Sequence, residues 1–513
     1  MSALHAVVNS ADPAAELRRA SRVLSGEDGQ YPARHELSDK VCLLDNGELL
    51  ILQGTRLEYD VMAYIDGLKR AGHQFKEVPS ALTELREHYA RGAQQDGKVG
   101  VGQTISNRQH QVLTLIGAAV ASNTSDVHFI VKRDIAILRN RVNGLLETVL
   151  DMRASDGLEL CSSIYQSMCD VADTTFNPQK PQDGRLKQEF LEAAGLYGAR
   201  IATRPTERGL LMVLRLLYNQ GDRVRNLTQL GYLPEQVAQI SRLTKKKNGI
   251  NIFSGPTGSG KSTSLQVLFS ELIRNFDGKI NALTIEDPPE YTIEGAVQTP
   301  LHNSDWPYSI RNAMRLDPDA ILIGEIRDLP SAVAAFQAGL TGHTVWTTLH
   351  ANDAATILQR LADIGVDPGL YGDPSIVTGL INQNLAPTLC PHCKTPWSAH
   401  AIALFPADVV ERVTKYCTPS TVFVRGPGCA ACRNTGIAGR TVIAEVIIPT
   451  LAFMRTFREK GKAEARAFWM NEMGGISKIQ HVIRRINEGV IDPIIGEKFI
   501  GLLDEDDIAG GIQ

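Results

Sequence analysis

A glycine-rich stretch in the middle of the chain has the composition of a phosphate-binding loop. Residues 255–263 read GPTGSGKST, which fits the pattern GxxxxGK[ST], and they lie between an apolar run and a helical stretch. Glycines let backbone N–H groups wrap a phosphate, and the start of the next helix favours negative charge. Lys261 is expected to bridge the β- and γ-phosphates, and Ser262 to ligate Mg²⁺. The alternative is a glycine-rich turn without a ligand. The residues expected to contact the nucleotide are Gly255, Pro256, Thr257, Gly258, Ser259, Gly260, Lys261, Ser262 and Thr263.

Two apolar runs farther along the chain end in carboxylates. AILIGEIRD places Glu325 directly after one run, and LTIEDPPEY places Glu286 and Asp287 after another. A carboxylate beside a phosphate loop can polarise the attacking water, so Glu325 is the best candidate for a general base. Glu286 and Asp287 are expected to hold Mg²⁺ or its waters. The alternative for these two acids is a pair of helix caps before prolines.

Histidines flank a fourth run. TGHTVWTTLHAND at 341–353 places His343 before the run and His350 at its end. Polar side chains at strand ends of α/β folds point toward the ligand crevice. A single histidine is more often structural, so the residues alone leave both histidines open between the two roles.

Two cysteine pairs have the spacing of metal knuckles. CPHC supplies Cys390 and Cys393, and CAAC supplies Cys429 and Cys432. Four thiolates can surround Zn²⁺ as a tetrahedron, which leaves no open position and therefore indicates a structural site. The alternative is four reduced thiols in a core. The other cysteines do not share this spacing: Cys417 is expected to be unused, and Cys42, Cys161 and Cys169 to be buried as small apolar residues.

The elements that would position these groups alternate along the chain. Four apolar strands, in GINIFSG, LTIEDP, AILIGEIRD and TVWTTLHAND, are separated by helical stretches. This alternation is typical of a parallel sheet wound with helices, so the fold class is α/β. An α+β unit is expected before it, from about 105 to 218, and it ends in the hairpin ARIATR/LLMVLRLL. Arg200 and Arg215 fall on the two strands of that hairpin, and strand periodicity puts Arg200 and Arg204 on one face.

The beginning of the chain predicts a separate small α/β unit. VCLLDNGELLIL reads as two strands around Asp45-Asn46-Gly47, a strong hairpin signal, and a helical stretch follows. Residues 91–104 are rich in Gly and Gln and are interpreted as a linker. The predicted domains are residues 1–104, 105–222 and 223–513, the last including a cysteine subdomain at 386–440.

Composition and charge disfavour several classes of protein. The 513 residues carry 53 Lys and Arg against 57 Asp and Glu, a net charge of −4, so the basic footprint of a nucleic-acid binder is absent. No stretch approaches the ~20 apolar residues that span a bilayer, and the first residues lack the pattern of an export signal. Eight cysteines, four of them in CxxC pairs, fit a reducing compartment with a metal site better than a disulfide framework.

Taken together, GPTGSGKST, IEDPPEY, MRLDPDAILIGEIRD and TGHTVWTTLHAND resemble the Walker A, Asp, Walker B and His boxes of the secretion-superfamily (type II/type IV) ATPases. SDVH, PQDGR and GCAACRNTGIAGR extend the resemblance over about 105–500. It implies a RecA-like P-loop domain preceded by a PAS-like domain. It also implies roles for Glu325 as catalytic glutamate, Glu286 near Mg²⁺, and His350 as γ-phosphate sensor, with Arg200 and Arg215 delivered to the nucleotide. Gln383-Asn384-Leu385 departs from the Gln-Arg-Leu typical of the family.

The resemblance also implies a cellular task. A tetracysteine zinc subdomain is typical of the assembly and secretion ATPases, so the interpretation is a hexameric motor that uses ATP, Mg²⁺ and structural Zn²⁺ to extend a type IV pilus. Such a homo-hexamer would work at the cytoplasmic face of a bacterial inner membrane, peripheral and attached through a platform protein and the pilus machinery.

Three other functions stay open at this point. One is a type II secretion ATPase that drives a pseudopilus. The second is a non-hydrolysing nucleotide-binding zinc scaffold, against which Lys261, Ser262 and Glu325 argue. The third is a nucleic-acid translocase, which the near-neutral charge disfavours, so no nucleic-acid partner is expected.

Overall fold

The structure is a computed structural model of the 513-residue chain and divides into two compact units, 1–105 and 106–513. None of the helices among the described residues is both long and apolar enough to cross a membrane. The predicted linker at 91–104 lies outside the described residues. Those residues are 21, 23–26, 30–33, 37–82, 84–85, 88–89, 107–171, 175–218, 226–301, 305–398 and 405–510.

The first unit contains a three-stranded sheet and one helix beside it. Its elements are β1 (Val41–Leu43), β2 (Glu48–Leu52), α2 (Tyr59–Arg70) and β3 (Lys76–Ser80), in strand order β1-β2-β3. β1 and β2 pair antiparallel, which confirms the predicted hairpin. α2 buries Val61, Ile65 and Leu68 at the spacing of one helical face.

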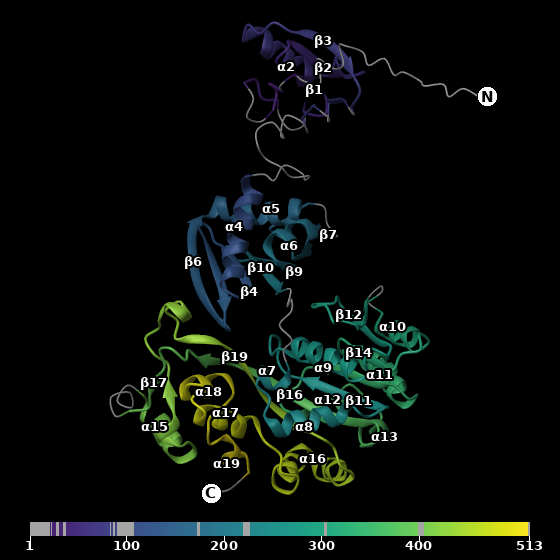
Figure 1. Cartoon of the computed structure of the whole chain (residues 1–513), viewed down its shortest axis with the longest axis vertical. Coiled ribbons are helices and arrows are strands. Elements are labelled where there is room, and N and C mark those ends of the chain that lie inside the picture. The colour runs from purple at the N-terminus through teal and green to yellow at the C-terminus, as the bar shows by residue number, and fades with distance from the viewer. Residues whose placement is uncertain are drawn as a thin grey trace, which may run out of the picture. The chain divides into compact units, whose positions relative to one another are not determined.

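The second unit begins with a seven-stranded antiparallel sheet and three helices (Figure 1). The strand order is β6-β5-β4-β10-β9-β8-β7. The strands are β4 (Thr124–Val131), β5 (Ile135–Val142), β6 (Leu145–Arg153), β7 (Cys169–Val171), β8 (Gln182–Leu186), β9 (Leu196–Thr206) and β10 (Gly209–Tyr218). The helices are α4 (Asn107–Ala121), α5 (Ala154–Met168) and α6 (Gln188–Ala194).

The helices of this part cover one face of its sheet. Alternate strand residues such as Phe129, Ile201 and Leu214 are buried in one core with Ile116 of α4 and Ile164 of α5. Because side chains alternate along a strand, the residues between them point to the other face. The predicted arginines, Arg200 and Arg215, lie on that other face, away from the helices.

A second seven-stranded sheet follows, and it confirms the predicted α/β class. Its order is β13-β12-β14-β15-β11-β16-β19, with parallel pairing throughout except for the last pair, β16 and β19. The strands are β11 (Gly249–Ser254), β12 (Ala282–Glu286), β13 (Val297–Pro300), β14 (Ala320–Ile323), β15 (Thr344–Leu349), β16 (Val377–Leu389) and β19 (Ile437–Ile447). The helices are α7 (Leu227–Leu230), α8 (Pro234–Leu243), α9 (Lys261–Asn275), α10 (Trp306–Ala313), α11 (Leu329–Leu340), α12 (Thr356–Asp363), α13 (Pro368–Tyr371) and α16 (Leu451–Glu472).

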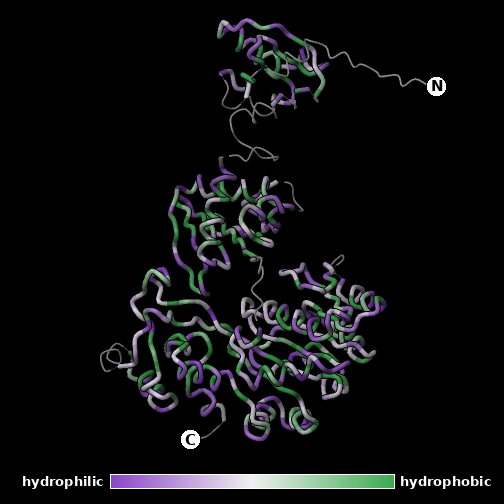
Figure 2. Tube along the Cα trace, viewed as in Figure 1, coloured by the Kyte–Doolittle hydropathy of each residue, from purple (hydrophilic) through white to green (hydrophobic). Residues whose placement is uncertain are grey.

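Helices pack on both faces of this sheet. In β11, Ile250 and Ile252 belong to the core with α10, α11, α12 and α16, whereas Phe253 belongs to the core with α7, α8 and α9. Hydrophobic residues accordingly follow the strands, with polar residues on the outer turns of the helices (Figure 2). Burial on both faces explains why the central strands read as continuous apolar runs.

The remaining elements surround the far end of β16 and β19. They are β17 (Thr395–Pro396), α15 (Ala407–Tyr416), η2 (Pro419–Thr421), β18 (Phe423–Val424), η3 (Ala430–Cys432), α17 (Lys478–Asn487), α18 (Pro493–Phe499) and α19 (Glu505–Gly510). A separate core that includes Val413, Val424, Val482 and Ile491 holds them together. This region carries the cysteine pairs.

Candidate active site

The phosphate-binding loop connects the buried strand β11 to helix α9, which begins at Lys261. A Cβ on Gly255 would lie 2.2 Å from the carbonyl oxygen of Gln383, so a side chain does not fit there. Gly260 caps α9 with a φ of 83°, a conformation that glycine adopts without strain. The first N–H groups of α9 thus face outward, where the helix N-terminus favours an anion.

Lys261 folds back onto its own loop. Its Nζ donates to the carbonyl oxygens of Gly255 at 2.8 Å and Pro256 at 3.1 Å. Burial lowers the pKa of Lys261 from its ordinary value, and the carboxylates of Glu325 and Glu290 oppose that shift. A bound phosphate would offer this ammonium a full negative charge in place of two carbonyl dipoles.

A buried polar pair supports the loop from the neighbouring strand. Gln383 on β16 donates from Nε2 to the carbonyl oxygen of Ser259 at 2.7 Å. The hydroxyl of Tyr232 contacts both Gln383 Oε1 and, at 3.2 Å, Ser264 Oγ on α9. These contacts fix the loop before any ligand arrives, which lowers the entropic cost of binding.

Glu325 follows β14 by two residues, as the sequence predicts. Its side chain is 24% exposed, contacts Arg327 Nε through Oε1, and lies 3.9 Å from His350 Nε2 through Oε2. The hydroxyl of Thr348 donates to the carbonyl oxygen of Gly324 at 2.7 Å and ties the adjacent strand ends together. The general-base candidate and the sensor candidate are therefore neighbours.

Glu286 ends β12 beside them. Its Oε1 accepts hydrogen bonds from Thr284 Oγ1 at 2.7 Å and Gln298 Nε2 at 3.1 Å, and burial raises its pKa. The element after Asp287 is β13, not a helix, so the helix-cap alternative for these acids is wrong. Arg327 Nη2 lies 3.6 Å from Asp287 Oδ2.

The two predicted arginines lie directly opposite each other on β9 and β10. They belong to a row across five strands: Arg185, Arg200, Arg215, Asp126 and Arg141. Like charges opposite each other destabilise a sheet. A row with four guanidinium groups and one carboxylate is consequently suited to an anionic ligand.

Each of the two arginines has weak or shared partners. Arg200 Nη2 donates to the carbonyl oxygens of Asp287 at 3.1 Å and Pro288 at 3.2 Å, and it lies 3.6 Å from Glu290 Oε1. Arg215 Nε donates to Asp126 Oδ1 at 3.0 Å. Burial lowers the pKa of Arg200 from its ordinary value, and Glu290 opposes that shift.

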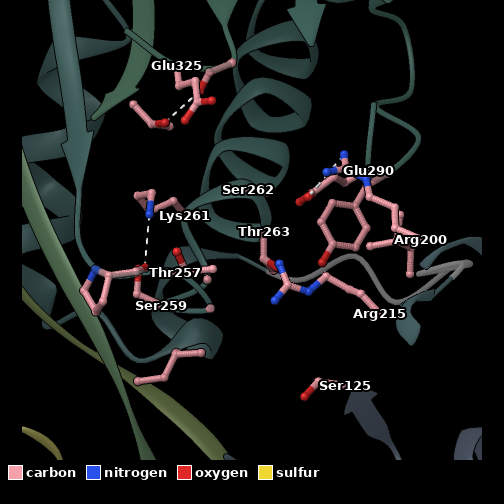
Figure 3. Close-up of a pocket in the computed structure, with 18 of the residues that line it drawn as sticks. Ser125, Arg200, Arg215, Thr257, Ser259, Lys261, Ser262, Thr263, Glu290 and Glu325 are labelled. Atoms are coloured by element: carbon pink, nitrogen blue, oxygen red, sulfur yellow. Dashed lines mark hydrogen bonds and ion pairs between the residues drawn. The ribbon is translucent and has the colours of Figure 1, made fainter. Parts of the chain in front are cut away.

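These groups open into one cavity of about 810 Å³, and Figure 3 shows Lys261, Glu325 and Arg215 around the same space. Among the residues predicted for the site, those that line the cavity are Pro256, Thr257, Gly258, Ser259, Gly260, Lys261, Ser262, Thr263, Glu286, Asp287, Glu325, His350, Arg200 and Arg215. Gly255 does not line the cavity; it lies at the start of the loop, close against the backbone of Gln383. The arrangement brings a phosphate loop, two strand-end carboxylates and several cations together.

The two histidines that the sequence left open separate in the structure. His350 follows β15 and reaches the cavity, whereas His343 precedes that strand at its other end. His343 Nδ1 bonds to Thr341 Oγ1 and the carbonyl oxygen of Ala338, both at 3.1 Å. The contacts of His343 indicate a structural role at the end of α11.

The four paired cysteines converge as predicted. Their sulfur atoms all lie within 4.8 Å of one another, and Cys390 to Cys429, Cys393 to Cys432 and Cys429 to Cys432 are each 3.8 Å apart. A tetrahedron with Zn–S bonds of about 2.3 Å has edges of about 3.8 Å. The donor set and its spacing therefore fit Zn²⁺.

Backbone groups complete the cysteine cluster. The N–H groups of Cys429 and Gly436 donate to Cys432 Sγ at 3.2 and 3.1 Å. Cys390 N bonds to the carbonyl oxygen of Gly436 at 2.9 Å, which joins the ends of β16 and β19. Such N–H donors stabilise negative charge on sulfur and orient a metal ligand.

Several residues of the cavity escaped the sequence analysis. Asp126, Arg141, Glu290, Arg327 and Arg440 all line it. Arg327 follows the general-base candidate by two residues in GEIRD, and Arg440 ends the quoted segment GIAGR, so both had a local signal. Asp126 and Glu290 likewise lie in the quoted segments SDVH and LTIEDPPEY, whereas Arg141 becomes visible only through strand register.

Comparison with known families and proteins gives consistent matches. Residues 106–492 match the family described as type II/IV secretion system protein. The chain is 36% identical over 341 residues to the type II secretion system protein E of Pseudomonas aeruginosa, and 35% identical over 340 residues to the type II secretion system ATPase E of Vibrio cholerae. Each match covers 65% of this chain and 64% of the relative, so just under two thirds of those proteins is represented.

A solved structure supports the fold. The Legionella pneumophila ATPase DotB is 20% identical, with a TM-score of 0.54, and the match covers 78% of this chain and 97% of DotB. The expected fold, a RecA-like P-loop domain behind a smaller α+β domain, agrees with this similarity.

Proposed function

Because the chain belongs to the type II/IV secretion system protein family, we propose that it is an ATP-hydrolysing motor of type II secretion. The observation that carries the proposal is the convergence of the phosphate loop, Glu325, Arg200 and Arg215 on one cavity. The names of the relatives favour type II secretion over the type IV pilus assembly that the sequence analysis put first.

The geometry supports a division of labour for hydrolysis. Lys261 leaves its loop carbonyls for the β- and γ-phosphates, and the N–H groups of α9 bind the anion. Glu325 accepts a proton from the attacking water, while the adjacent His350 senses the γ-phosphate. Ser262 and Glu286 would hold Mg²⁺ or its waters, and the ion would neutralise developing phosphate charge. Arg200 and Arg215 stabilise the transition state from the other sheet.

We further propose how hydrolysis becomes motion. The arginines belong to the sheet of 124–218 and the phosphate loop to the sheet of 249–447, so release of phosphate removes the anion that holds the two sheets together. A homo-hexamer at the cytoplasmic face of an inner membrane would pass this movement to a platform protein and drive a pseudopilus. The domain limits near 104 and 222 remain predictions.

The proposal is tested by the ATPase rate and the solution mass of the full chain with Mg·ATP. We expect turnover at the mass of six subunits, and none after Lys261→Ala. A monomer that binds nucleotide without turnover would contradict the motor and favour the non-hydrolysing scaffold.

We also propose that the cysteine cluster holds structural Zn²⁺, for which its donor set and 3.8 Å edges are the support. Cys393→Ser should lose the metal and lower the melting temperature, because metal binding free energy is folding free energy. Cys417→Ser is the matched control, since Cys417 lies between the two pairs in the sequence but does not belong to the cluster. Equal zinc content in both variants would refute the site.

A further inference from the structure

The segment that follows β15 carries His350 and is held by side chains from distant parts of the chain. Residues 350–355 lie between β15 and α12. Three of their backbone groups have side-chain partners: Asn382 Nδ2 donates to Ala351 O at 2.9 Å, Lys478 Nζ donates to Asn352 O at 2.5 Å, and Ala354 N donates to Glu445 Oε2 at 3.0 Å.

Glu445 is the buried carboxylate among these partners. It lies on β19, its side chain is 1% exposed, and besides Ala354 N it accepts from Arg466 Nη2 at 3.2 Å and from the backbone N–H of Lys478 at 3.3 Å. A buried charge is costly unless every lone pair finds a donor. The carboxylate therefore fixes the positions of the donors around it.

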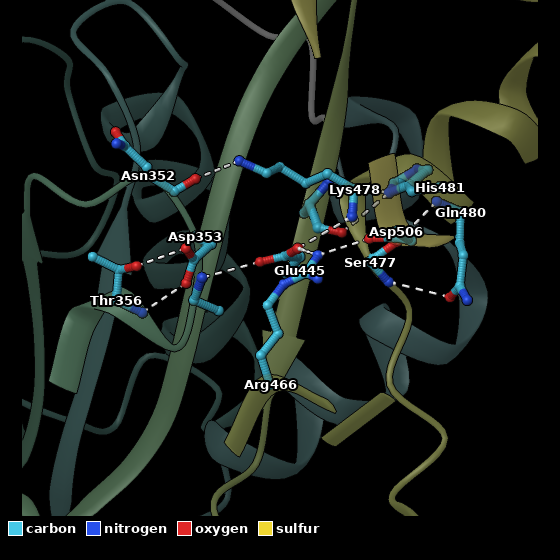
Figure 4. Close-up of polar contacts among 12 residues, drawn as sticks. Asn352, Asp353, Thr356, Glu445, Arg466, Ser477, Lys478, Gln480, His481 and Asp506 are labelled. Atoms are coloured by element: carbon cyan, nitrogen blue, oxygen red, sulfur yellow. Dashed lines mark hydrogen bonds and ion pairs between the residues drawn. The ribbon is translucent and has the colours of Figure 1, made fainter. Parts of the chain in front are cut away.

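The same contacts extend into the C-terminal helices (Figure 4). Arg466 of α16 also donates to Asp506 Oδ1 at 3.1 Å, and Asp506 Oδ2 accepts from Ser477 Oγ. Ser477 in turn caps α17, at whose first residue Lys478 lies. We call Glu445, Arg466, Lys478 and Asp506 the C-terminal charge network.

Lys478 is the member that approaches the nucleotide cavity. Besides Asn352 O, its Nζ donates to Asn384 Oδ1 at 3.2 Å, and Asn384 lines the cavity. Burial lowers the pKa of Lys478 from its ordinary value, whereas the carboxylate of Glu445 raises it. The half-buried ammonium gives up part of its hydration for two contacts, one on the His350 segment and one on the cavity wall.

We propose that Lys478 and Glu445 are positioning residues for His350. His350 lies two residues before the carbonyl that Lys478 holds, its side chain is 58% exposed, and its Nε2 is 3.9 Å from Glu325. A half-exposed side chain keeps a fixed direction only when its backbone is fixed. The C-terminal charge network supplies that restraint and links α16, α17 and α19 to the nucleotide. The inference rests on the proposed role of His350.

The test is a double-mutant cycle in the full chain, with Mg·ATP as substrate and kcat corrected for the folded fraction. Lys478→Met should lower kcat roughly tenfold with KM for ATP nearly unchanged, because a misplaced group costs transition-state rather than ground-state interactions. In the His350→Ala background the same change should cost nothing further. Lys478→Arg should restore most of kcat, since a guanidinium keeps the donors.

Lys462→Met is the matched control. Lys462 lies 3.6 Å from Asp353 on the same segment, but its side chain is 43% exposed and its partners among the described residues do not include the carbonyl of Asn352. It should leave kcat unchanged. If Lys478→Met fails to fold, Lys478→Gln takes its place in the cycle.

The outcomes distinguish the positioning role of Lys478 from the proposed mechanism of hydrolysis. An equal loss from Lys478→Met in both backgrounds, or none in either, overturns the inference and leaves the proposed hydrolysis intact. Wild-type kcat in His350→Ala alone removes the proposed role of His350, and the inference with it. A loss of thermal stability with unchanged kcat would show that the lysine only stabilises the fold.

Discussion

The nucleotide cavity and the C-terminal charge network are both rich in charge, yet they treat charge in opposite ways. In the cavity Arg215, Arg327 and His350 have side chains 45%, 56% and 58% exposed, and arginines face arginines across strands. In the network Glu445 and Asp506 are 1% and 14% exposed, and both carboxylates bond to Arg466. The charged side chains of the cavity can therefore exchange partners when a ligand binds, whereas those of the network keep the same partners.

Exposure and the number of partners distinguish two roles for ionisable groups in this protein. A half-exposed cation that holds only a carbonyl or one shared carboxylate binds an incoming phosphate at little cost. A buried carboxylate with three donors can lose none of them without an unpaired charge. We therefore expect substitutions in the cavity to change turnover with little loss of stability, and substitutions in the network to do the reverse, except where the network touches the His350 segment.

The largest expected effect is on turnover. Glu325→Gln keeps the size of the side chain but removes the base, so kcat should fall about 10²- to 10⁴-fold while nucleotide binding and melting temperature stay near wild type. Steady-state ATPase assays and equilibrium binding of ATP measure the two quantities. Glu294→Gln, on the exposed loop after β12, is the control. Turnover within twofold of wild type in Glu325→Gln would remove the general base from the proposal.

The next effect is on stability. Glu445→Gln should lower the free energy of unfolding by roughly 3 kcal/mol, because it removes a buried charge from its paired arginine. Glu235→Gln breaks a surface pair with Arg484 and should cost less than about 1 kcal/mol. Urea unfolding of the two variants gives the comparison. Similar losses of unfolding free energy in the two variants would mean that the burial of Glu445 adds nothing to the stability that its ion pair provides.

The sequence predicts the cavity much better than it predicts the network. The phosphate loop, Glu325 and His350 each follow a contiguous pattern of strand, loop and helix, so their place at one edge of the sheet could be predicted. Glu445 is a single acid within an apolar strand, and the amide that it binds belongs to a residue 91 positions away. Only the folded chain brings these groups together.

Strand prediction failed for a related reason. The apolar pattern predicts four of the seven strands of the main sheet but not β13, β16 and β19. β16 contains Asn382, Gln383 and Asn384, which interrupt its apolar pattern. In the structure Asn382 and Gln383 are buried but bond to β11 and the phosphate loop. Tertiary hydrogen bonds thus make a polar stretch fit a central strand.

A smaller effect on catalysis is expected from the arginine row, and it tests whether Arg215 contacts phosphate. Arg215→Ala should lower kcat/KM roughly 10- to 100-fold, the value of a charged hydrogen bond of about 1.5–3 kcal/mol. Arg204 shares the open face with Arg200 but is exposed and does not line the cavity, so Arg204→Ala is the matched control and should be silent. Equal effects of the two changes would indicate a general influence of positive charge rather than contact with phosphate.

The smallest effect concerns a buried group beside the network. His481 on α17 is fully buried, accepts from Ala444 N at Nδ1 over 3.0 Å and faces the carbonyl oxygen of Gly231 at Nε2 over 3.1 Å. These partners require the neutral ring with its proton on Nε2, and burial lowers its pKa to about 4. The unfolded chain therefore takes up the proton first as the pH falls.

Stability should accordingly be complete above about pH 6.5 and should decline toward pH 4, by about 1 kcal/mol between roughly pH 7.5 and 5.5. Urea unfolding of wild type and His481→Gln at both values measures the difference, since glutamine does not titrate. A pH dependence that is the same in the two proteins would assign the decline to other groups. A steeper decline of stability in wild type than in His481→Gln would show that this region also holds a buried neutral side chain to fixed partners.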